Sequence, residues 1–277
     1  MVGGVELCSL YEWGARIGSA YSWFDSFVGK HASPDAVIIV DSEDDKPDQY
    51  ILTSPHFNGL VNPVDVAARV LALKALWDGA FFIDHGFAYW SLNVVDLINL
   101  ETNRTYSTGY SDPRASPFGQ ANQLSVDHLR HRDPFCNFTS TMIFLAKHDD
   151  ISKGMLQFIG YNGITWISLY ALMDFMKTNG WDNARIAKEA VKTESEVKRF
   201  AHTANNFAAI GPFARHGDLG HQAPKIAMTL EEAANLVFPA VKKFLLERAH
   251  SINLPDIWAR EKNRRMPISN KSDILGA

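Results

Sequence analysis

The chain changes character near residue 148, and this change limits its fold more than any other feature. Before it, β-branched residues gather in short runs such as Ala36–Val40, a pattern typical of strands. After it, apolar residues recur at helical spacing in three segments, 182–190, 194–206 and 229–249. The sequence therefore predicts an α+β fold. It comprises a strand-rich domain (1–148), an all-helical domain (149–250) and an extended C-terminal tail (251–277).

Strand-like runs and boundary residues such as Asn62, Pro63 and Gly79 predict the secondary structure of the first half of the chain. Two strand-like runs make residues 36–53 a predicted β-hairpin. Pro63 follows the capping residue Asn62 and opens a helix that is predicted to end near Asp78, with Gly79 as its cap. Further strands are predicted at 80–84, 94–100 and 138–146.

Composition narrows the classes of function. The chain is 46% hydrophobic and carries a net charge of −4, which argues against a dominant surface for nucleic-acid phosphates. Its two cysteines, Cys8 and Cys136, lie far apart, and no apolar leader follows a basic N-terminus, so we expect a reducing, cytoplasmic location. The uncharged stretch 156–175 is long enough for a membrane span, but its polar residues favour a buried core helix, and no membrane association is expected.

Residues 199–224 hold the densest group of specific polar side chains. They comprise the end of one predicted helix and the loop 205–224 that leads to the next, which opens with a capping box at Thr229 and Glu232. Long loops inside compact domains are usually functional or mobile. We expect this loop to line a cleft between the two domains, with a polar lining of His202, Asn205, Asn206, Arg215 and His216. Arg215 would pair with an anionic group and the asparagine amides would orient it.

A resemblance covers about the last third of the folded chain. Thr203–Asn205, Ala214–Gly217 and Met228–Ala233 occur in an order similar to that of a C-terminal helical module of uncharacterised bacterial proteins. The resemblance implies a bacterial, cytoplasmic origin and carries no mechanism. The leading hypothesis is an interaction or regulatory protein that binds a protein partner or a small anionic ligand, with a homodimer as one form of partner. No metal and no cofactor are expected.

Arg215 and His221 offer an enzymatic alternative. Their spacing resembles the catalytic pattern of HEPN ribonucleases. In that chemistry an arginine steadies phosphate charge and a histidine moves a proton to or from the 2′-hydroxyl. The family places its motif at a helix, whereas this pair lies in a loop containing Gly and Pro. The competing interpretation is that Arg215 and His216 tie the loop to helix ends.

A third hypothesis is DNA binding through residues 184–206. Two predicted helices joined by a short turn resemble a helix-turn-helix, which would place Lys198 and Arg199 in the major groove. Val191 occupies the turn position where that motif prefers glycine, and an αα-hairpin within a bundle is the commoner source of the pattern.

Other polar clusters are weaker candidates. Asp127, His128, His131 and Asp133 could share a helix face and ligate a metal, but Arg130 and Arg132 lie between them, so a polar loop is favoured. His56 and the pair Asp84–His85 lie at predicted strand ends, where either a functional or a hydrogen-bonding role fits.

Overall fold

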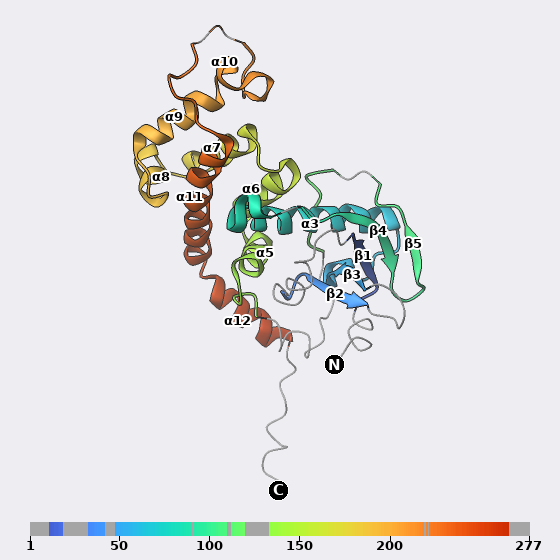
Figure 1. Cartoon of the computed structure of the whole chain (residues 1–277). Coiled ribbons are helices and arrows are strands. Elements are labelled where there is room, and N and C mark those ends of the chain that lie inside the picture. The colour runs from blue at the N-terminus through green and yellow to red at the C-terminus, as the bar shows by residue number, and fades with distance from the viewer. Residues whose placement is uncertain are drawn as a thin grey trace, which may run out of the picture.

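The computed structural model describes residues 11–18, 33–41, 48–89, 91–109, 112–119, 133–218, 220 and 222–265. An antiparallel sheet forms from the N-terminal part, and helices follow it, so the predicted α+β class is confirmed. In Figure 1 the sheet lies at one end of the molecule and the C-terminal helices at the other, with helix α3 running between them.

The sheet has five strands in the order β2-β3-β1-β4-β5. Their bounds are β1 Trp13–Ile17, β2 Val37–Asp41, β3 Gln49–Thr53, β4 Val94–Asn99 and β5 Arg104–Tyr106. The predicted hairpin is confirmed: β2 and β3 pair antiparallel from Val37↔Thr53 to Asp41↔Gln49. The acidic residues 42–47 between them lie outside the described residues.

Helix α3 (Pro63–His85) overturns the prediction of a helix to Asp78 followed by a strand at 80–84. Its start is as predicted, since Asn62 accepts a hydrogen bond from the backbone N–H of Val64. Gly79 is not a cap. A Cβ atom there would lie 2.1 Å from the carbonyl oxygen of Leu156, so the glycine allows another helix to approach. Every residue from Ala75 to Ile83 is buried, so the apolar run that looks like a strand is the core of a helix.

The strand predicted at 138–146 is also wrong, because Phe138–His148 forms helix α5. Asn137 caps it by accepting a hydrogen bond from Ser140 N at 2.9 Å. The run Met142–Ala146 is buried, and a fully buried helix shows no amphipathic period that would separate it from a strand.

The apolar stretch 156–175 belongs to two helices, α6 (Asp150–Asn162) and α7 (Trp166–Thr178). Gly163 ends α6 with a φ of +64°, and Thr165 opens α7 with a capping box. Among the described residues, no helix combines the length and apolar character needed to cross a membrane.

The remaining predicted helices are confirmed, and the tail is corrected. The C-terminal helices are α8 Asn183–Glu189, α9 Glu194–Ala204, α10 Phe207–Ile210, α11 Leu230–Ser251 and α12 Leu254–Arg265. Short 3₁₀ turns occur at η1 Pro55–Phe57, η2 Gly86–Ala88 and η3 Gly211–Phe213. Residues 254–265 are helical instead of extended because buried Leu254 and Trp258, four residues apart, anchor one helix face to the core.

One hydrophobic cluster of buried side chains extends from Trp13 on β1 to Trp258 on α12. Helix α3 contacts β1 and β4 on one side and α5, α6 and α11 on others. The boundary predicted after residue 148 falls between α5 and α6 and stays a prediction.

Candidate functional site

Residues 205–229, called here the projecting segment, contain most of the predicted site. The segment leaves α9 at Asn205, forms α10 and η3, and returns to α11 at Thr229, with residues 219 and 221 outside the described part. Figure 1 shows α10 at the end of the molecule farthest from the sheet.

Asparagine side chains fix the start of the projecting segment, and the backbone N–H of Met228, which donates to Thr203 Oγ1 at 3.1 Å, fixes its end. Asn205 Nδ2 donates to Ala201 O at 2.9 Å and so caps α9. Asn206 is buried; its Oδ1 accepts from Ala209 N at 3.1 Å, and its Nδ2 donates to Gln222 O at 2.7 Å. These amides therefore hold backbone in place, and their predicted role in orienting a ligand stays a prediction.

Arg215 lies against helix α7. Its guanidinium carbon is 4.4 Å from the centre of the Tyr170 ring, and its Nη2 is 3.5 Å from Asp174 Oδ2. Its backbone N–H donates to Ala204 O at 2.9 Å, which ties the loop to the end of α9. The side chain remains 41% exposed. Arg215 thus anchors the projecting segment to α7, and its predicted pairing with an anionic ligand stays a prediction.

Two of the three histidines predicted for this site lie among the described residues. His202 on α9 and His216 in the loop are both exposed. His221 lies outside the described residues, so the Arg215–His221 pair of the ribonuclease hypothesis stays a prediction.

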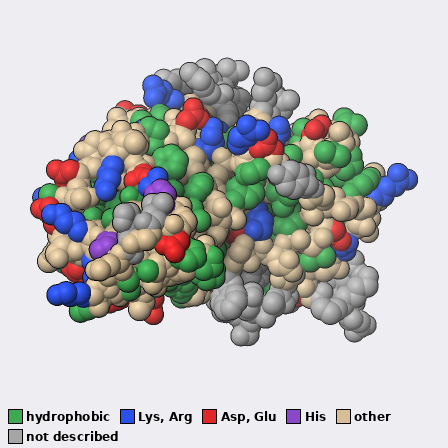
Figure 2. Space-filling model, turned by 90° about the horizontal axis from the view of Figure 1, so that it is seen from above, with side chains coloured by type: hydrophobic (Ala, Val, Ile, Leu, Met, Phe, Trp, Pro, Cys, Tyr) green, Lys and Arg blue, Asp and Glu red, His purple; other side chains and the backbone are tan. Residues whose placement is uncertain are grey.

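Large apolar side chains that the sequence analysis did not single out are exposed on the projecting segment. Phe213 is 70% exposed, Ile226 68% and Phe207 36%. Figure 2, seen from above the view of Figure 1, shows hydrophobic side chains interspersed with histidines and with basic and acidic residues. Large hydrophobic side chains that are exposed together on one segment often mark an interaction site. Covering them with the surface of a partner removes apolar area from water, which is energetically favourable.

The helix-turn-helix hypothesis gains little from the geometry of α8 and α9. Arg199 is half-buried, with its Nη2 3.2 Å from Glu232 Oε1, whereas Lys198 is exposed. Val191 adopts the left-handed backbone, with a φ of +55°, at the position where the DNA-binding motif prefers glycine. DNA binding stays an untested prediction.

The proposed metal ligands Asp127, His128 and His131 lie outside the described residues. Asp133 is exposed and accepts a hydrogen bond from the backbone N–H of Phe135 at 2.8 Å. Over the described ranges, no group of three or more His, Cys, Asp or Glu side chains could hold a metal ion.

His56 belongs to a buried ionic network whose other members the sequence did not reveal. His56 Nε2 lies 2.9 Å from Asp35 Oδ1, and Lys147 Nζ lies 3.1 Å from both Asp35 Oδ1 and Glu261 Oε2. Glu261 Oε1 is 3.1 Å from His148 Nε2. The network therefore joins the residues just before β2, the turn η1, the end of α5 and the C-terminal helix α12.

Electrostatics keep the carboxylates of this network ionised. Burial raises the pKa of Asp35, but Lys147 and His56 outweigh it and hold the pKa well below its ordinary value. Burial likewise opposes ionisation of Glu261, yet His148 and Lys147 lower its pKa to about 2. Asp35 Oδ2 and His56 Nδ1 are buried and have no hydrogen-bond partner among the described residues, which occurs at functional sites as well as in structural networks.

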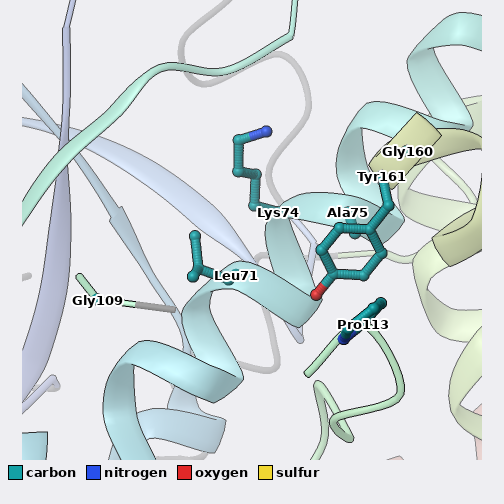
Figure 3. Close-up of a pocket in the computed structure, with 7 residues that line it drawn as sticks. All are labelled: Leu71, Lys74, Ala75, Gly109, Pro113, Gly160 and Tyr161. Carbon is teal, nitrogen blue, oxygen red and sulfur yellow. The ribbon is translucent and has the colours of Figure 1, made fainter. Parts of the chain in front are cut away.

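A cavity of about 350 Å³ lies between α3, α6 and the loop after β5. Leu71, Ala75, Gly160, Tyr161 and Pro113 supply its largely apolar lining (Figure 3). Lys74 points away from Tyr161 in this view, as its 2.5 Å ion pair with Asp78 on the same helix requires. With its lysine engaged elsewhere, the cavity offers apolar volume and few polar groups to fix a ligand.

Asp84 and His85 lie at the C-terminal end of α3, not at a strand end as predicted, because residues 80–84 are helical. Asp84 forms an ion pair with Lys242 of α11. Both residues line a second groove.

Comparison of the chain with protein-family models, curated proteins and solved structures finds no significant match.

Proposed function

We propose that this chain is a protein-binding module and that the projecting segment is its docking surface. The observation that carries the proposal is the exposure of Phe207, Phe213 and Ile226 on a segment whose backbone is held by hydrogen bonds at Asn205 and at Met228. A segment fixed before binding loses little conformational entropy when a partner covers it, so its exposed apolar area can contribute to affinity.

The charges around these apolar residues indicate the chemistry of the partner. Within the projecting segment Lys225 is exposed and Arg215 is partly exposed, against one exposed carboxylate, that of Asp218. His202 and His216 add groups that gain charge in mildly acidic solution. The partner surface should therefore present apolar side chains bordered by carboxylates, and the predicted anionic ligand becomes an acidic group of that partner.

The proposal also retains the bacterial cytoplasm as the compartment. The exposed thiol of Cys136 supports it, because exposed thiols persist best in reducing surroundings.

Site-specific photo-crosslinking in bacterial cells tests the proposal. A photoreactive phenylalanine analogue replaces Phe213, and Val95, an exposed residue of the sheet, serves as the matched control position. We expect one dominant crosslinked species at position 213, absent at position 95. A second copy of this chain in that species would identify a homodimer, and another protein would identify a heterologous partner.

Specificity is established with variants of the projecting segment. Ile226→Asp should abolish the crosslink formed at position 213. Once the partner is identified, Phe213→Ala should weaken the affinity of the chain for it about tenfold or more. Val95→Asp should change neither the crosslink nor the affinity. Equal labelling at positions 213 and 95, or a crosslink that survives Ile226→Asp, would refute the proposal.

A further inference from the structure

A groove of about 410 Å³ lies between the end of α3 and one face of α11. Its lining on α11 recurs at helical spacing, so it forms one continuous stripe: Glu231, Ala234, Asn235, Phe238, Pro239 and Lys242. The opposite wall comprises Ile83–His85 and the turn η2. Gly86 makes this wall by adopting a φ of +56°, which turns the chain sharply out of α3. The volume suits a small ligand.

The ionic groups of the groove leave one negative charge unbalanced. Lys242 pairs with Asp84 and also lies 4.7 Å from the centre of the Phe138 ring. His85 Nε2 is 3.5 Å from Asp84 Oδ2, so the imidazole faces the same carboxylate. Glu231 is exposed at the other end of the stripe and makes no ion pair among the described residues. Its carboxylate is therefore available to a cation.

Backbone carbonyls add to the negative potential. Pro239 lies inside α11 and has no N–H, so the carbonyl of Asn235, four residues earlier, lacks its helical donor. Asn235 and Pro239 both line the groove. The C-terminal end of α3 contributes the negative end of a helix dipole to the opposite wall. Carbonyl groups accept hydrogen bonds, and two donors of the lining, Lys242 and His85, face Asp84.

Apolar side chains complete the groove. Ala234 and Phe238 are buried and form its floor, and Phe87 at the rim is 49% exposed. An aromatic rim above an apolar floor favours the hydrocarbon part of a ligand and also attracts a cation.

From this arrangement we propose that the groove binds a small organic ammonium compound. The ammonium group is held by the Glu231 carboxylate and the carbonyl of Asn235, and its hydrocarbon body lies between Phe87 and Phe238. This site is separate from the projecting segment, so its test does not depend on the protein-binding proposal.

Calorimetric titration of the full chain with three matched probes tests the chemistry. Phenethylamine is expected to bind with a Kd of about 1 mM, as suits a fragment of this size. Phenylethanol, which lacks the charge, should bind about tenfold more weakly, and phenylacetate should not bind. Binding of all three with equal affinity, or no binding of the amine, would overturn the proposal.

Two variants locate the site. Glu231→Gln should weaken phenethylamine binding about tenfold, whereas Glu194→Gln, an equal loss of charge at an exposed position of α9, should not change it. Pro239→Ala supplies an N–H that can donate to the Asn235 carbonyl. It should therefore weaken the binding of phenethylamine several-fold and leave the binding of phenylethanol unchanged. An amine affinity unchanged in Glu231→Gln, with the variant still folded by circular dichroism, would refute the assignment.

Discussion

Gly160→Ala tests whether the close approach of α3 and α6 determines the stability of the fold. A Cβ atom at Gly160 would lie 1.9 Å from the carbonyl oxygen of Ala75 on α3. The obstacle is backbone, so α6 would have to retreat by about 1.5 Å to restore a normal contact. Gly154 in the same helix is a matched control, because a Cβ there meets nothing within 4 Å.

The two substitutions should change the free energy of unfolding in opposite directions. Replacing glycine with alanine inside a helix stabilises it by about 1 kcal/mol, and Gly154→Ala should show that gain. Gly160→Ala has the same gain but also overpacks the interface, at a cost of about 3 kcal/mol. We therefore expect Gly160→Ala to lower the free energy of unfolding by about 2 kcal/mol.

Urea denaturation followed by tryptophan fluorescence and circular dichroism measures both changes, because the midpoint moves with stability. A Gly160→Ala variant as stable as Gly154→Ala would show that the two helices lie farther apart than described. It would refute the reasoning that glycine is needed at this crossing.

Three further substitutions test other parts of the structure. Val191→Gly should raise the melting temperature, with a gain of about 1 kcal/mol, because a β-branched residue is strained at a φ of +55°; an unchanged melting temperature would count against that backbone. Asp78→Ala should lower the free energy of unfolding by about 3 kcal/mol or more in urea titrations, since this buried carboxylate accepts from Tyr89 Oη at 2.7 Å; a loss under about 1 kcal/mol would contradict it. Glu261 has a folded-state pKa of about 2, below its ordinary 4.5, so its interactions with His148 and Lys147 stabilise the protein above pH 4.5 and are lost as the pH falls towards about 2. Glu261→Gln should therefore flatten the dependence of stability on pH in that range, and an unchanged slope would show that the pair is not formed.

Features set by neighbouring residues could be predicted from the sequence. Asn62 and Thr229 cap the helices that they were expected to cap, and the hairpin of residues 36–53 forms. Each depends on contacts within a few residues or on a short turn. The strand predictions failed where burial replaced periodicity, as at Phe138–Ala146.

Features set by distant contacts could not be predicted. The reason for Gly79 is the backbone of Leu156, which no local pattern reveals. The same holds for the ionic network, in which Lys147 contacts Asp35 and Glu261 across more than a hundred residues each. At the projecting segment, sequence reasoning singled out Arg215 but not its neighbours Tyr170 and Asp174 on α7.

Helix α3 has a consequence for how the molecule opens in solution. A helix buried on all sides over residues 75–83 has no face that water can reach while its neighbours stay in place. Its amide protons should therefore exchange with solvent only when the whole structure unfolds, so their exchange rates report the global free energy of unfolding. Amides of α10, at the far end of the molecule, should exchange through small local openings instead.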